Sequence, residues 1–121
     1  MNTFDELNKN ESKSKRQQIL DAAYNIFSRK GFYKTTVDEI IAMADTGKGT
    51  VYNYFVNKEQ LFYTIVKEKH EPFTNKLKSI YEKDITPTEK INCMVRAFLE
   101  FYDENIGLWR ALMHEIRALS P

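Results

Sequence analysis

The stretch that decides the fold is Gly47-Lys48-Gly49-Thr50-Val51-Tyr52-Asn53-Tyr54-Phe55. On a helix, where successive residues turn by about 100°, Val51 and Phe55 fall on one side, and Gly49 and Asn53 fall on the opposite side. The first side is apolar and can be buried, whereas the second offers a bare backbone and an amide. A helix this short is not stable alone, so its neighbours must hold it in place.

A second short helix is expected immediately before this stretch. Thr36 and Glu39 have the spacing of a capping box, in which the Thr hydroxyl accepts from the Glu39 amide and the Glu39 carboxylate accepts from the Thr36 amide. Apolar residues then recur with a helical period up to Ala44, and Asp45-Thr46 is typical of a turn. Two short helices joined by such a turn predict a helix-turn-helix.

Helices are also expected on both sides of this pair. An amphipathic pattern runs from about Ser14 to Lys30, and Gly31 can take the left-handed conformation that ends helices. Residues 1–12 lack this pattern and are expected to form a flexible arm. The short pair together with the preceding helix predicts a three-helix, homeodomain-like unit over residues 13–58.

About three further helices are expected downstream. Asn57 is a cap residue for one long helix kinked at Pro72, and Thr86-Pro87 begins the next helix. A break at 105–107 separates that helix from a last one over residues 108–119. No alternating strand pattern competes, so the predicted fold class is all-α.

Composition excludes several classes of protein. The single cysteine, Cys93, rules out a disulfide framework and a site of several thiolates within one chain, and His70 and His114 have no partner at helical spacing for a metal. No nucleophile stands beside a base, so neither an enzyme nor a cofactor is expected. The single cysteine makes a reducing, cytoplasmic setting the default expectation. No apolar run approaches the roughly 18 residues of a membrane span, so no membrane partner is expected.

The net charge of +1 conceals an uneven distribution. Residues 13–58 hold eight Lys and Arg against four Asp and Glu, a net charge of +4. Residues 59–121 hold nine Lys and Arg against ten Asp and Glu, a net charge of −1. A basic segment suits an anionic partner such as DNA, although a solvated charged face is the alternative interpretation.

These residues carry a family resemblance. From about residue 15 to residue 63, the chain resembles the tetracycline-repressor (TetR) family of bacterial transcriptional regulators. The resemblance rests on the run Ile19-Leu20-Asp21-Ala22-Ala23 with Phe27, on Gly31-Phe32, on Thr35-Thr36-Val37-Asp38-Glu39-Ile40, on the quoted stretch 47–55 and on Lys58-Glu59-Gln60-Leu61.

The resemblance implies a regulator, usually a repressor, that binds a palindromic operator in double-stranded DNA through a helix-turn-helix at about 36–55. A small-molecule effector would release it, and the full-length protein would be a homodimer. The positions that match DNA-contacting positions of the family are Thr36, Thr46, Gly47, Lys48, Gly49, Thr50, Tyr52, Asn53, Tyr54 and Lys58. Lys13, Lys15, Arg16 and Lys34 would add phosphate contacts.

Two departures from the family pattern stand out. The family's usual turn is Ala-Gly-Val, whereas this chain has Ala44-Asp45-Thr46, which places an acid near the DNA side. Family members also run to nearly twice this length. Residues 59–121 are therefore expected to form an incomplete helical regulatory domain, and the chain is either a fragment or dimerises in an unusual way.

The downstream half resembles the family only in its helix layout. Aromatic and Met side chains there are candidates for an apolar ligand pocket, with an ordinary core as the alternative. The candidates are Phe62, Phe98, Tyr102, Trp109 and Met113. A rival interpretation of the whole chain is a helical protein-interaction module whose basic face meets an acidic partner.

Overall fold

The computed structural model describes the backbone of residues 3–119 and the side chains of residues 15–118. Within this range the chain forms helices only, which confirms the predicted all-α class. The helices are α1 (Thr3–Lys30), α2 (Val37–Ala44), α3 (Lys48–Tyr54), α4 (Lys58–Glu82), α5 (Pro87–Glu104) and α6 (Ile106–Leu119). No described helix is long and apolar enough to cross a membrane.

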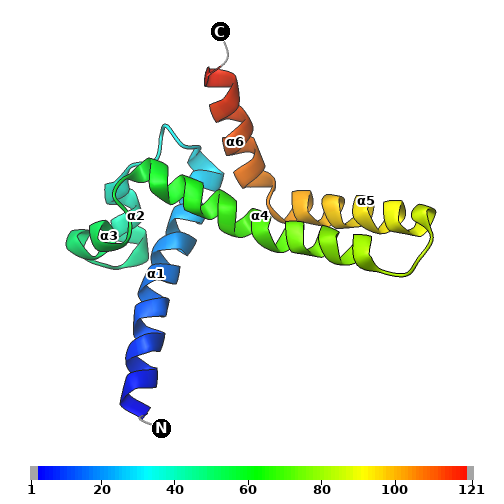
Figure 1. Cartoon of the computed structure of the whole chain (residues 1–121). Coiled ribbons are helices and arrows are strands. Elements are labelled where there is room, and N and C mark those ends of the chain that lie inside the picture. The colour runs from blue at the N-terminus through cyan, green and yellow to red at the C-terminus, as the bar shows by residue number, and fades with distance from the viewer. Residues whose placement is uncertain (1–2, 120–121) are drawn as a thin grey trace.

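The helices are arranged around α4 (Figure 1). α1 crosses one end of α4, beside the short helices α2 and α3. At the other end, α4 and α5 pack antiparallel and form a protruding helical hairpin. α6 then leaves this hairpin and packs against α1. The downstream half therefore contacts the helix-turn-helix unit through both α4 and α6.

The capping residues explain where the helices begin. The Asn57 side chain accepts from the amide of Gln60 at 2.8 Å, and Thr86 and Glu89 form a complete capping box. The box predicted at the start of α2 is only half formed. Thr36 accepts from the Glu39 amide at 3.2 Å, but the Glu39 carboxylate binds the Lys30 ammonium at 2.8 Å. The ion pair with α1 has replaced the return bond, because α1 ends beside the start of α2.

Two predicted boundaries are wrong. α1 begins at Thr3 rather than near Ser14, because residues 3–13 contain neither Gly nor Pro to interrupt the helical backbone. The predicted mobility of the arm stays untested, and the side chains of residues 1–14 lie outside the described part. The expected break at 105–107 shrinks to Asn105, since α6 begins at Ile106 and includes Gly107. Pro72 lies inside α4, which confirms one long helix there, whereas the predicted kink stays a prediction.

One buried cluster joins α1, α2, α3, the first turns of α4 and one side of α6. Its members include Ile19, Ala23, Ile26, Phe27, Ile40, Val51, Phe55, Leu61, Phe62, Ile65, Leu108 and Ala111. The cluster continues across the domain boundary predicted after Lys58. That domain boundary stays a prediction. The cluster holds α3 in place through packed side chains that extend as far as α6.

Candidate nucleic-acid interface

The turn between α2 and α3 is closed by backbone hydrogen bonds. The amides of Asp45 and Thr46 donate to the carbonyls of Ala42 and Ile41 at 3.3 and 3.4 Å. Asp45 has φ 52° and ψ 52°, the left-handed conformation that glycine adopts most easily. Asp is one of the few other residues that tolerate it, so the turn forms without a glycine.

The helix α3 has the two sides that the sequence predicts. Val51 and Phe55 are buried at 1% and 3% exposure within the core cluster. On the opposite side, Gly49 and Asn53 are exposed, and Thr50 is half-buried. The buried side fixes the helix, and the polar side is left to face outward.

Gly49 has no packing reason to be glycine. Apart from Gly49 itself, its two chain neighbours and the nearby backbone of its own helix, no described atom lies within 4 Å of the position that a Cβ would occupy there. A glycine inside a helix is less favourable than alanine by up to about 1 kcal/mol. The chain accepts this cost at a place where its own atoms would admit a side chain, so the bare backbone is free for close approach by another molecule.

The remaining predicted contact residues surround α3. Lys48 is exposed in its first turn, Tyr52 is 44% exposed, and Thr46 is half-buried in the turn before α3. Tyr54 is half-buried and packs against the core cluster. Thr36 is exposed and caps α2.

Lys58 has an internal partner that the sequence did not predict. Its ammonium donates to the carbonyl oxygen of Phe32 at 2.8 Å and lies 4.2 Å from the centroid of the Phe32 ring. This contact ties the start of α4 to the segment between α1 and α2. Lys58 is therefore a structural residue as well as a predicted phosphate contact.

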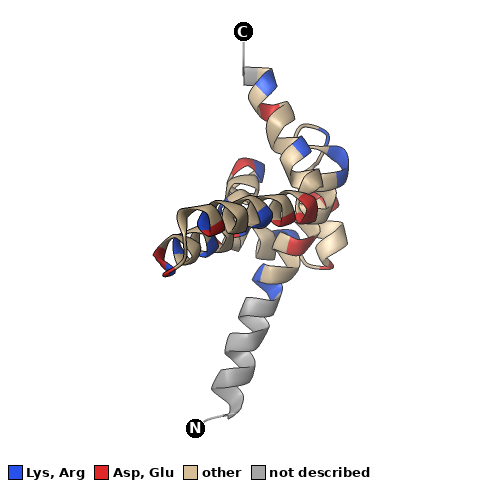
Figure 2. Cartoon of the chain, turned by 90° about the vertical axis from the view of Figure 1, so that its right-hand side faces the viewer, with Lys and Arg blue, Asp and Glu red and all other residues tan. Residues whose placement is uncertain are grey.

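The predicted outer phosphate contacts differ in their surroundings. Lys15 and Lys34 are exposed, whereas the Arg16 guanidinium pairs with the Glu68 carboxylate at 2.8 Å. The side chain of Lys13 lies outside the described part. Figure 2 shows both signs of charge along the protruding α4–α5 hairpin, in agreement with the near-balance of residues 59–121.

Comparison with known proteins gives a family for this arrangement. The profile described as bacterial regulatory proteins, tetR family, matches residues 19–65, which hold the C-terminal part of α1, all of α2 and α3, and the start of α4. The chain belongs to the tetR family. The match covers the helix-turn-helix and the part of the core cluster that α1 to α4 supply.

Relatives of this tetR-family chain are bacterial regulators. It is 29% identical over 85 residues to the fatty acid metabolism regulator protein of Bacillus subtilis, covering 70% of this chain and 44% of that protein. It is 33% identical over 87 residues to the uncharacterized HTH-type transcriptional regulator YhgD of the same species, covering 72% and 46%. The chain thus spans about half the length of the curated relatives it matches.

A solved structure of a TetR-like transcriptional regulator from Rhodococcus sp. RHA1 has the same arrangement of helices. Its TM-score is 0.71 at 31% identity, over 81% of this chain and 54% of the other. The likeness extends beyond the residues matched by the profile. The tetR-family arrangement therefore includes part of the downstream helices.

The structure does not gather the five predicted ligand-pocket residues in one place. Phe62 is buried in the core, with its ring 5.2 Å from Phe27 and 5.3 Å from Phe32 between centroids. Phe98, Tyr102 and Trp109 form a separate chain of ring contacts at 6.5 and 6.2 Å, and Met113 is 41% exposed. The assignment of a ligand pocket to these residues stays a prediction.

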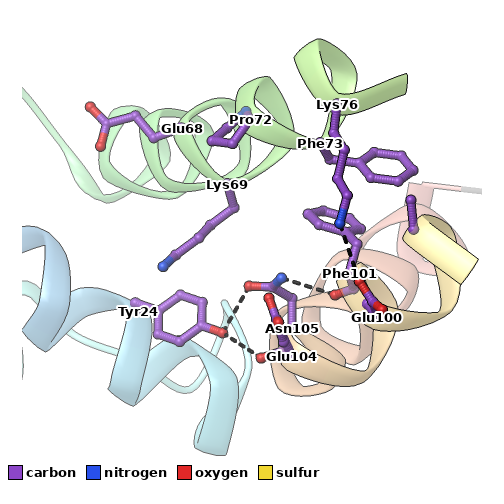
Figure 3. Close-up of a pocket in the computed structure, with 11 residues that line it drawn as sticks. Tyr24, Glu68, Lys69, Pro72, Phe73, Lys76, Glu100, Phe101, Glu104 and Asn105 are labelled. Carbon is purple, nitrogen blue, oxygen red and sulfur yellow. Dashed lines mark hydrogen bonds and ion pairs between the residues drawn. The ribbon is translucent and has the colours of Figure 1, made fainter. Parts of the chain in front are cut away.

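The structure instead shows an open hollow of about 410 Å³ between α1, α4 and α5 (Figure 3). Phe73 and Phe101 stack at 4.5 Å on its wall, and the Lys69 ammonium lies 4.5 Å from the ring centroid of Tyr24. The Tyr24 hydroxyl donates to the Asn105 side-chain oxygen at 3.1 Å. Sequence periodicity could not find this hollow, because three helices contribute to it and each residue also fits a helix surface.

Proposed function

We propose that this chain is a DNA-binding transcriptional repressor of the tetR family, acting in the cytoplasm. In this proposal α3 lies in the major groove of a palindromic operator, two copies bind its two halves, and a small-molecule effector releases them. The chain acts by binding and carries out no catalysis. The relatives named above are regulators, which supports the proposal.

The observation that carries the proposal is the unexplained glycine on α3. Neither packing nor a turn requires glycine at position 49. The space at its Cβ position is open, and the residue lies within α3 rather than in a turn. Asn53 and Thr50 flank this bare backbone with groups that can bond base edges and phosphates. A DNA groove that α3 enters closely would explain why Gly49, Thr50 and Asn53 occur together on this helix.

The proposed contacts divide by chemistry. Lys48 and Lys58 supply charge, and the amides at the starts of α2 and α4, next to Thr36 and Asn57, offer donors to phosphate. Thr50, Tyr52 and Asn53 face outward to read base edges, with Tyr54 and Thr46 at the margin. Gly47 and Gly49 allow the backbone to approach.

The test is duplex binding measured by fluorescence anisotropy. The probe is the sequence recovered from a random pool of duplexes about 30 base pairs long, which spans two half-sites a helical turn apart. We expect affinity to fall steeply with salt, because each neutralised phosphate contributes about 0.9 to the log–log slope. No duplex binding even at low salt would overturn the proposal and favour the interaction module with an acidic protein partner.

Three variants locate the contact. Gly49→Ala should weaken duplex binding at least tenfold while leaving the fold intact, because a methyl group would stand between backbone and groove. Lys48→Ala should lower the salt slope by about 1, whereas its control Lys78→Ala, which removes an exposed lysine of α4, should leave the slope unchanged. Unchanged affinity in Gly49→Ala would show that α3 does not enter the groove.

A further inference from the structure

A second hollow lies where the end of α1, the loop that follows it and α6 meet. Its volume of about 380 Å³ falls within the range of about 300–1,000 Å³ that is usual for small-molecule sites. The described residues that line it include no Asp or Glu. We call it the basic hollow, because its lining includes Arg29, Lys30, Lys34, Arg110 and His114.

Close packing of two helix backbones forms the floor of the basic hollow. α6 packs on α1 so closely that a Cβ at Gly107 would lie 2.7 Å from the Cβ of Ser28, and both residues line the hollow. Arg29 directly follows Ser28, and Arg110 comes about one turn after Gly107. The contact therefore brings a cation of α1 and a cation of α6 to the walls of one space.

Most of these cations have no partner within the described chain. Lys30 pairs with the Glu39 carboxylate at 2.8 Å. No ion pair among the described side chains involves Arg29, Lys34 or Arg110. Figure 2 shows Lys and Arg close together near the first turns of α6. Three positive charges thus border the basic hollow without a compensating charge from the described residues.

The acidic residue Glu115 of α6 does not supply this charge. Its carboxylate lies close to the Tyr33 hydroxyl and raises the pKa of that group above 10.0. It also lines a different hollow, beside Phe62 and Tyr63. The carboxylate is therefore directed to another part of the surface of α6.

The position of Arg110 favours a bound anion over a merely solvated surface. The helix dipole explains basic residues in the last turn of α1, but Arg110 lies in the first half of α6. Like charges on two packed helices repel each other, and the close contact between α1 and α6 keeps the helices from separating. An anion between Arg29 and Arg110 removes this repulsion. A guanidinium group suits phosphate best, because its planar fork donates two parallel hydrogen bonds.

We propose that the basic hollow binds a small molecule through a phosphate ester or diphosphate group, held between Arg29 of α1 and Arg110 of α6. Lys34 and His114 line the same space and add positive charge and a ring nitrogen. The hollow shares no lining residue with the hollow of Figure 3. The ligand joins the helix-turn-helix unit to α6, so the inference goes beyond the proposed function and does not depend on DNA binding.

The test uses inorganic pyrophosphate as the probe, titrated by calorimetry into the 121-residue chain without DNA or metal ions. The ionic strength is held at ~0.1 M with NaCl. We expect one saturable site with a Kd of about 1 mM or below. The double variant Arg29→Gln, Arg110→Gln should weaken this affinity at least about tenfold, because it removes both guanidinium forks. Both side chains are exposed, so the helicity measured by circular dichroism should not change.

The matched control is the double variant Lys78→Gln, Arg96→Gln, which removes two exposed positive charges of α4 and α5 outside the basic hollow. It should bind pyrophosphate as the wild type does. Acetate, which carries one charge, should bind at least about tenfold more weakly than pyrophosphate. The inference is overturned by no saturable binding of pyrophosphate, by the same affinity in the two double variants, or by equal affinity for acetate.

Duplex binding distinguishes a small ligand from the operator backbone as the source of the phosphate. Arg29→Gln, Arg110→Gln should bind the selected duplex with the affinity and salt slope of the wild type, because Lys34, Lys48 and Lys58 are unchanged. A salt slope lower by about 2 would show that the two arginines contact operator phosphates, and would overturn the inference. A chain that binds pyrophosphate but no duplex would refute only the proposed function.

Discussion

The contact between α6 and α1 can be tested by one methyl group. At Gly107, an added Cβ would lie 2.7 Å from the Cβ of Ser28, 3.0 Å from its carbonyl oxygen and 3.2 Å from its Cα. Non-bonded carbon atoms prefer about 3.5–4.0 Å. Because two of these three atoms are backbone, a side-chain rotation cannot relieve the overlap, and Gly107→Ala must move α6 away from α1.

The expected magnitude follows from two opposing effects. Overpacking of this kind typically costs about 1–3 kcal/mol, whereas Gly to Ala in a helix gains up to about 1 kcal/mol. We expect Gly107→Ala to lower the free energy of unfolding by about 1–2 kcal/mol. For a chain of this size, each kcal/mol corresponds to ~4 °C in Tm.

The assay is urea and thermal unfolding followed by circular dichroism, with Gly49→Ala as the matched control. Both glycines are the second residue of their helix, but only Gly107 faces another backbone. The control should be as stable as the wild type or more so. Ser28→Gly should cost less in the Gly107→Ala background than alone, because it removes the atom at 2.7 Å. A Gly107→Ala protein as stable as the control would refute the reasoning.

Three further predictions concern single contacts. Asp45→Gly should raise the free energy of unfolding by about 1 kcal/mol in urea titrations, because glycine adopts φ 52° without steric cost. Asn105→Ala should lower it by about 2 kcal/mol, since the side chain is 7% exposed and bonds both the Phe101 carbonyl and the Tyr24 hydroxyl. Burial and the Glu104 carboxylate raise the pKa of Tyr24 above 10.0, so the folded state holds this proton more tightly than the unfolded state. Stability should therefore fall as pH rises above about 10, and Tyr24→Phe should flatten that fall.

Local signals in the sequence predicted the helices, except for the starts of α1 and α6, and they predicted the two sides of α3. Thr86 and Glu89 specify a helix start by themselves, because all atoms of the capping box lie within four residues. Val51 and Phe55 are buried, and Gly49 and Asn53 are exposed, as the helical period predicts. The contacts of the exposed side with DNA stay predictions.

Contacts between distant segments lay beyond the sequence. The partner of Lys58 is a carbonyl 26 residues earlier in the chain, and nothing near Lys58 indicates it. Phe62 has the helical spacing of a pocket residue or of a core residue, and only the position of α1 shows that it packs on Phe27. Glu39 likewise pairs with Lys30 instead of completing the capping box, because α1 ends beside the start of α2.

The surroundings of the two helical glycines, Gly49 and Gly107, differ in the structure, and the sequence alone does not show this difference. Gly107 looked like a helix breaker, yet it lies inside α6, and the Ser28 backbone leaves no room for a side chain. Gly49 has the same place in its helix and open space around it. Since the internal requirement that explains Gly107 is missing at Gly49, we propose that the bare backbone there serves a molecule that α3 approaches closely. The exposed Asn53 and Lys48 on the same short helix point to a polar and anionic one, which is the chemistry of a DNA groove.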